Sequence, residues 1–158
     1  GSFLDAETAD LFVATGAYLV PTLIAGHTVE RIATEQPDFY VPEVRQKAIE
    51  VGPIMKTALR TAYEKGVKIA FGTDAGVFPH GENAGEFIYM SEIGIPADYI
   101  LQSATITNSK LLDMSDKLGQ IAPGFYADLI ATDADPLEDI ATLQDIKFVM
   151  KNGVIYKN

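Results

Sequence analysis

One carboxylate stands at the point where a buried strand is expected to end. The stretch KIAFGTDAGVFPHG, residues 68–81, is an apolar run that breaks at Gly72-Thr73-Asp74 and opens into a loop containing Gly, Pro and His. In parallel α/β folds, ligands bind beyond the carboxyl ends of the strands, which is where Asp74 falls. An ionised carboxylate there can ligate a metal or move protons for an activated water. The alternative is a turn or helix-cap aspartate that accepts hydrogen bonds from nearby backbone N–H groups.

Two histidines are the other side chains that could take part in chemistry. His80 lies in the loop after Asp74, where a ring nitrogen could reach a substrate or a metal; the alternative is a loop histidine without a role. His27 follows the other expected strand and so lies on the same face, although a histidine without a role is favoured there. The chain has two histidines and no cysteine. It is not expected to form a zinc site by itself, because such a site takes three or four protein ligands.

The composition is that of a folded, acidic chain. Its 158 residues are 47% hydrophobic and carry a formal net charge of -10. That charge argues against nucleic acid or an anionic membrane surface as a partner, because both would repel it. No segment reaches about 18 consecutive apolar residues, so no membrane span is expected. The lack of cysteine excludes disulfides, thiolate metal sites and cysteine nucleophiles.

The elements that would carry these side chains alternate between helices and apolar strands. Asp5 is expected to cap a helix over residues 6–15. Two strands, within residues 17–25 and over 67–71, are nearly all apolar, which is typical of a parallel sheet covered on both faces. Pro21 is expected to end the first of them, because proline cannot donate to a ladder.

The segments between and after these strands are predicted to be mainly helical. Residues 24–41 are expected to form a long loop or an irregular helix. A helix from Pro42 to Gly66 is expected to kink or split at Gly52-Pro53, because proline lacks the N–H and clashes inside a helix. Shorter helices are expected at 84–93, 96–105 and 108–113.

The last part of the chain consists of short strand-like runs and turns. Asn152-Gly153 stands between two apolar runs and indicates a β-hairpin, because a type I′ turn needs positive φ at both residues. We therefore expect two units: an α/β region over residues 1–120 and a small all-β piece over residues 121–158.

Together, these stretches resemble the metal-dependent amidohydrolase superfamily. GVKIAFGTDAGVFPHGENAGEF, residues 66–87, is similar to the last barrel strand and following loop of those enzymes, and GAYLVPTL, residues 16–23, is similar to their seventh strand. The stretch from Ser103 to Asn158, which contains LGQIAPGFYADLIATDADPLEDI, looks like their carboxyl-terminal segment almost throughout. The similarity is greatest to the imidazolonepropionase-like branch, which includes the Xaa-Pro dipeptidases (prolidases).

The resemblance implies an α/β fold: the last two β/α units of an amidohydrolase-type TIM barrel, followed by the carboxyl-terminal strands of a small β-sandwich. It implies a site with one or two zinc ions, or other divalent metals, in which Asp74 is both metal ligand and proton shuttle. His80 would line the substrate pocket. The family's other ligands have no counterpart in this sequence. They are a His-x-His after the first strand, a carboxylated Lys after the fourth and single His residues after the fifth and sixth.

The chain is therefore expected to be the carboxyl-terminal portion of such an enzyme. Gly1-Ser2 is read as native sequence that follows the sixth-strand His, with a remnant of tag removal as the alternative. By itself the chain is expected to be inactive, and to need the missing amino-terminal part or a second copy. Among compartments the cytoplasm is favoured, although a signal peptide would lie on the missing part.

The expected reaction is hydrolysis of an amide or peptide bond in a small, dipeptide-like substrate by metal-activated water. Two alternatives stay open. One is a non-catalytic α/β module that needs a partner chain. The other is a deaminase or a cyclic-amide (imidazolone-type) hydrolase of the same superfamily, because the residues that select the substrate lie mostly on missing strands.

Overall fold

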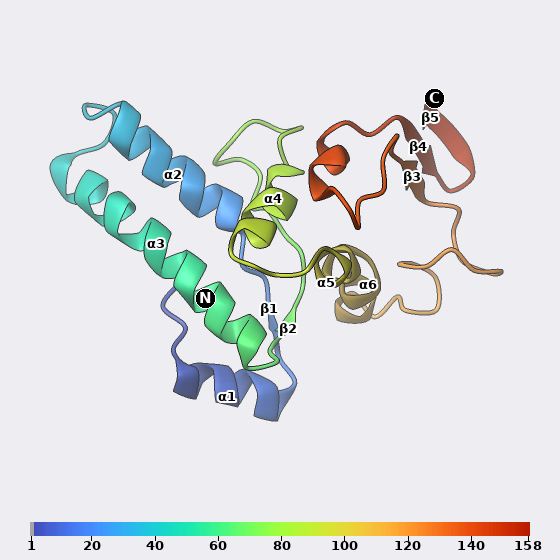
Figure 1. The fold of residues 1–158 in the computed structure, drawn as a ribbon, viewed down its shortest axis with the longest axis horizontal. Helices are drawn as coiled ribbons and strands as arrows, with labels where there is room; N and C mark the ends of the chain where they lie inside the picture. The colour runs from blue at the N-terminus through green and yellow to red at the C-terminus, as the bar shows by residue number, and fades with distance from the viewer. Residues whose placement is uncertain (1) are drawn as a thin grey trace.

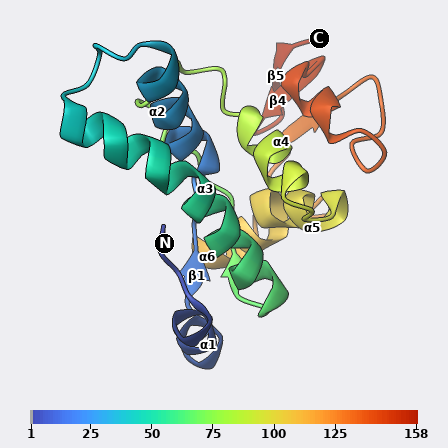
Figure 2. The same ribbon diagram turned by 60° about the vertical axis from the view of Figure 1, so that its left-hand side comes forward.

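The computed structural model describes residues 2–158, so Gly1, part of the expectation about the first two residues, lies outside the described residues. The helices within residues 6–64, labelled α1 to α3, gather at one end of the molecule and a small sheet at the other (Figure 1). The helices within residues 85–111, labelled α4 to α6, lie between them (Figure 1). A view turned by 60° shows α2 and α3 running side by side (Figure 2). The observed elements confirm an α/β chain.

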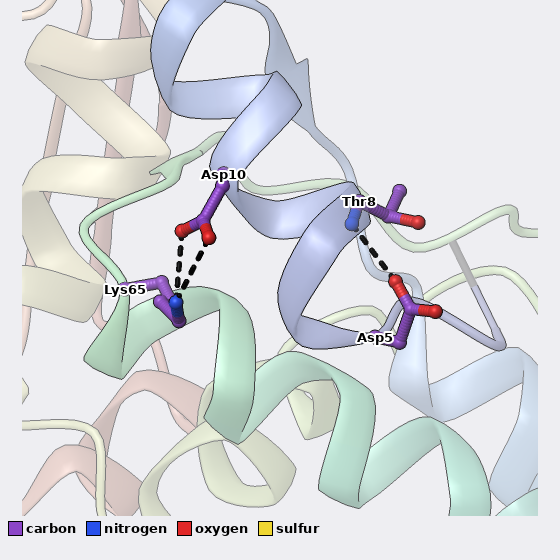
Figure 3. Close-up of polar contacts among 4 residues, drawn as sticks. All are labelled: Asp5, Thr8, Asp10 and Lys65. Carbon is purple, nitrogen blue, oxygen red and sulfur yellow. Dashed lines mark hydrogen bonds and ion pairs between the residues drawn. The ribbon is translucent and has the colours of Figure 1, made fainter.

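Helix α1, Ala6–Thr15, forms as its local signals predict. The Asp5 side chain accepts a hydrogen bond from the Thr8 N–H at 2.8 Å, which satisfies a backbone donor at the helix start. Gly16 ends the helix in the left-handed conformation. An exposed ion pair between Asp10 and Lys65, at 2.8 Å, links α1 to the chain that follows α3 (Figure 3).

Two short strands form the parallel sheet that the apolar runs predicted. Strand β1, Tyr18–Leu19, pairs with β2, Lys68–Ile69, so that Leu19 lies opposite Ile69. The Ala70 N–H extends the pairing by donating to the Leu19 carbonyl at 2.9 Å. Parallel pairing places the carboxyl ends of both strands at one edge, and the loops that follow them meet there.

Helix α2, Leu23–Glu35, corrects one expectation: most of the predicted long loop or irregular helix over 24–41 is a regular α-helix. Thr22, the residue before the helix, is of a type that often caps helices, but its side chain makes no capping bond here. The cap comes from a distant residue, Glu86, which is described below.

Helix α3, Pro42–Glu64, is continuous through Pro53 and is not split there. Its packing against α2 explains why Gly52 belongs in the middle of the helix. A Cβ at Gly52 would stand 2.0 Å from Oε2 of Glu30 on α2. The two helices therefore approach closely at a point where one of them has no side chain.

Three further helical segments follow β2. Helix α4 spans Gly85–Glu92, close to its predicted range. The two pieces expected after it form one helical run. It consists of α5, Ala97–Gln102, a single turn of π-helix, η1, Ser103–Thr107 (the π-turn below), and α6, Asn108–Leu111. The π-turn borders the end of β2, because the Phe71 N–H donates to the Ser103 carbonyl at 3.2 Å.

The carboxyl-terminal strands form an antiparallel sheet in the order β3, β4, β5, over Leu129–Ala131, Phe148–Lys151 and Val154–Lys157. Asn152 and Gly153 both have positive φ, which confirms the hairpin between β4 and β5. The 3₁₀ helix η2, Ile140–Gln144, packs on α4 and contributes Ile140 and Leu143 to the hydrophobic core. The division at residue 120 stays a prediction.

The core lies between β1, β2 and the helices. Its fully buried side chains include Leu59, Ile69, Met90 and Ile100. Among residues 2–158, no helix is both long and apolar enough to cross a membrane.

Candidate active-site rim

Asp74 lies in the loop that leaves the carboxyl end of β2, as predicted. Its side chain is exposed, and its backbone has φ of 52°, a left-handed conformation that is uncommon for a residue other than glycine. Within residues 2–158, the Asp74 carboxylate takes part in none of the side-chain hydrogen bonds or ion pairs. It is therefore available to a ligand, and it does not serve as a local cap.

The backbone before Asp74 is held on two sides. Asn83 donates from Nδ2 to the Thr73 hydroxyl oxygen at 3.0 Å, one residue before Asp74. On the other side, a Cβ at Gly72 would lie 2.4 Å from Cγ1 of Val20 and 3.9 Å from Cγ2 of Thr22. The two loops thus touch at Gly72, where any larger residue would force the Val20 side chain to move.

The structure does not gather the two histidines around Asp74. His80 is exposed in the loop between Asp74 and α4. His27 lies on α2 with its ring against that of Tyr89, at a centroid distance of 4.4 Å. It lines a cleft of about 390 Å³ between α2 and α4, which Arg31 and Glu82 also line but Asp74 does not.

Glu86 is the buried ionisable group that sequence reasoning missed. It is 0% exposed, and its two carboxylate oxygens accept hydrogen bonds from the N–H groups of Leu23 and Ile24, at 2.9 and 2.7 Å. Burial raises the pKa of Glu86 to about 7, while the hydrogen bonds from Ile24 and Leu23 oppose that rise. A glutamate near the start of a predicted helix carries no local sign that it caps another helix 63 residues away.

The described residues contain no cluster of side chains that could hold a metal ion. In residues 2–158, no three His, Cys, Asp or Glu side chains lie close enough together to hold a metal ion. The chemistry of Asp74 suits a metal, because a free carboxylate at this edge is a hard oxygen ligand. Asp74 is a single carboxylate, which is fewer than the three or four protein ligands that a zinc site takes.

Large apolar side chains are exposed around the sheet and at both ends of the molecule. Val20, at the end of β1, is 44% exposed, and Ile121 is 89% exposed. Others are Phe3, Leu11, Val13, Leu112 and Ile130. Among residues 2–158, β1 and β2 pair only with each other, so each has an open edge. Open edges and exposed apolar side chains of this extent are typical of a surface that packs against more protein.

Comparison with known proteins places these features in context. The Amidohydrolase family is matched over residues 1–156. Ochratoxinase from Aspergillus niger is 29% identical over 161 residues, covering 99% of this chain and 32% of that protein. A crystal structure of a Xaa-Pro dipeptidase with methionine bound in its active site superposes with a TM-score of 0.95 and 49% identity, covering 100% of this chain and 39% of the other.

A prolidase complexed with N-methylphosphonate-L-proline is also similar, with a TM-score of 0.85 and 31% identity, covering 98% of this chain and 38% of that structure. This chain spans about a third of the length of the curated relative and less than two fifths of the dipeptidase. Relatives of this kind are therefore much longer than the chain described here.

Proposed function

The chain belongs to the amidohydrolase family, and from that premise we propose that it is the carboxyl-terminal portion of a metal-dependent hydrolase of small amides or dipeptides. The observation that carries the proposal is the free, exposed Asp74 carboxylate at the carboxyl end of β2. The prolidase and dipeptidase likenesses support a substrate with a peptide bond next to proline or a similar residue.

Asp74 is the proposed catalytic residue. It ligates one of the metals, zinc or another divalent ion, together with residues outside this chain. When bound, the metal supplies Lewis-acid activation of water. Asp74 takes a proton from the attacking water and passes it to the leaving nitrogen, because a free carboxylate can accept and return a proton within one reaction cycle. His80, exposed in the same loop, lines the substrate pocket.

The missing part of the enzyme has a defined place in this proposal. Strands β1 and β2 are the seventh and eighth of a TIM barrel, and β3 to β5 belong to a small β-sandwich. The open edges of the parallel pair support this arrangement. Residues 1–120 and 121–158 then belong to two units of one longer protein, and the isolated chain lacks the other metal ligands.

The test uses the full-length protein and a panel of Xaa-Pro dipeptides, with release of the free amino acids as the readout. Asp74→Asn should lower kcat/KM by roughly 10²–10⁴-fold, the usual contribution of a general acid–base group. Asp113→Asn is the matched control, because Asp113 is also exposed and also has a positive φ, of 55°. Wild-type kcat/KM in the Asp74→Asn variant would refute the catalytic role of Asp74. If the full-length wild type hydrolyses no dipeptide of the panel, the non-catalytic module is favoured instead.

A further inference from the structure

Glu86 holds the start of α2 from another helix. Both carboxylate oxygens accept backbone hydrogen bonds, from Leu23 at 2.9 Å and from Ile24 at 2.7 Å. These N–H groups belong to the first turn of α2, where helical donors lack partners of their own. Thr22 provides no side-chain cap there, and its φ is 50°. Glu86 therefore supplies the cap and holds a strained turn immediately after β1.

That turn lies against the loop that carries Asp74. At Gly72, two residues before Asp74, an added Cβ would lie 2.4 Å from Cγ1 of Val20, which would have to move, and at ordinary van der Waals distance, 3.9 Å, from Cγ2 of Thr22. Gly85, next to Glu86, is similarly close to Ile24, whose Cδ1 would be 2.9 Å from an added Cβ. Hydrogen bonds and packing thus link α4 to the start of α2, and Val20, two residues before Thr22 in the chain, lies against Gly72.

Asn83 makes the second connection from the same segment. Its Nδ2 donates to the Thr73 hydroxyl at 3.0 Å, and its Oδ1 accepts from the Gly81 N–H at 3.2 Å. Asn83 thus ties its own loop and the residue before Asp74 together. Glu86 is fully buried, and burial disfavours the ionised form of its carboxyl group, so this distant cap lowers the stability of the fold when Glu86 is ionised.

We propose that Asn83 and Glu86 are positioning residues for Asp74, Asn83 through Thr73 and Glu86 through the turn at Thr22. The inference rests on the proposed catalytic role of Asp74. Neither positioning residue is expected to contact the substrate. Their loss should displace Asp74 without removing it, so that catalysis suffers more than binding.

The test compares the full-length wild type with Glu86→Gln and Asn83→Ala. Gln keeps the size of Glu86 but presents one acceptor and one donor to two N–H groups, so amide exchange at Leu23 and Ile24 should accelerate. In both variants kcat should fall roughly tenfold or more with KM unchanged, as a small misplacement of a catalytic group predicts. In Asn83→Ala, exchange at Leu23 and Ile24 should stay as in the wild type.

Glu92→Gln is the matched control, since it makes the same chemical change at an exposed position of α4. An unchanged kcat in both variants would overturn the inference, as would a loss confined to KM. If Glu86→Gln fails to fold, the kcat and KM of Asn83→Ala alone test the inference: an unchanged kcat, or a loss confined to KM, overturns it. If the wild type hydrolyses no substrate of the panel, the proposed function fails. Crystal structures of the two variants then test the inference. A backbone φ at Asp74 that moves away from 52° supports it, and a φ that stays near 52° overturns it.

Discussion

At the scale of single residues, two carboxylates of this chain have opposite surroundings. Asp74 is exposed and without a protein partner among residues 2–158, whereas Glu86 is buried and accepts two backbone hydrogen bonds. An exposed carboxylate in a left-handed turn is free to meet a ligand. A buried carboxyl group has a different pKa in the folded and the unfolded state, so its protonation changes the free energy of unfolding.

Glu86 makes a specific contribution to the pH dependence of stability. Its pKa is about 7 in the folded chain, against an ordinary glutamate value of 4.5. Between about pH 4.5 and 7 the folded state therefore keeps a proton that the unfolded state releases, so the free energy of unfolding falls as the pH rises. The loss attributable to Glu86 should reach about 3 kcal/mol by pH 8, at 1.4 kcal/mol per pH unit.

Chemical denaturation at pH 5 and pH 8 measures this contribution. Glu86→Gln should remove most of the difference, because glutamine does not titrate in this range. Glu92→Gln should keep it, since Glu92 is exposed on the same helix. A Glu86→Gln protein with the same difference as the wild type would contradict the raised pKa.

At the scale of elements, the π-turn over Ser103–Thr107 packs closely against a later turn. A Cβ at Gly119 would lie 2.7 Å from the Thr105 carbonyl oxygen and 2.9 Å from Ser109 Oγ. Gly119 also has φ of 88°. The chain thus needs glycine there for two independent reasons, backbone conformation and space.

Gly119→Ala should destabilise the protein more than Gly124→Ala. Gly124 has a similar φ of 91° but nothing within 4 Å of an added Cβ. The loss of stability in Gly124→Ala therefore measures only the free-energy cost of placing alanine at a positive φ. The clash at Gly119 involves a backbone oxygen that cannot rotate away, and overpacking of this kind adds about 1–3 kcal/mol. Thermal or chemical denaturation of both variants measures the difference. Equal losses would show that the π-turn moves freely.

At the scale of the whole molecule, the described residues form a core but leave part of their surface uncovered. Helices and η2 enclose the buried side chains, whereas the two-stranded parallel sheet keeps open edges within residues 2–158. The relatives it resembles are more than twice as long. We expect this surface to be covered by the remaining strands of the proposed barrel.

The purified 158-residue chain should contain no stoichiometric zinc, because Asp74 is a single ligand and residues 2–158 hold no cluster of three candidate ligands. Native mass spectrometry combined with elemental analysis measures the mass and the metal content together. Stoichiometric zinc on the monomeric chain would mean that Asp74, His27 and His80 converge, against their separate positions described above. Zinc found only on a dimer would instead support completion of the site by a second copy.

Features that depend on near neighbours in the chain could be predicted from the sequence. Asp5 caps the helix that starts beside it, and Asn152-Gly153 makes the hairpin turn within two residues. The parallel pairing followed from two apolar strands, and the place of Asp74 followed from the strand before it. In each case the deciding interactions are local or follow from a periodic pattern.

Features that depend on distant residues were decided only by the tertiary structure. The start of α2 is stabilised by Glu86 from α4, whereas the sequence alone predicted a long loop or an irregular helix over residues 24–41. Helix α3 continues through Pro53 while it packs along α2, where Gly52 lets the two helices approach. The links from Asn83 to Thr73 and from Glu86 to Leu23 join segments far apart in the chain. No pattern in either segment specifies its partner, because such contacts exist only once the two segments have packed together.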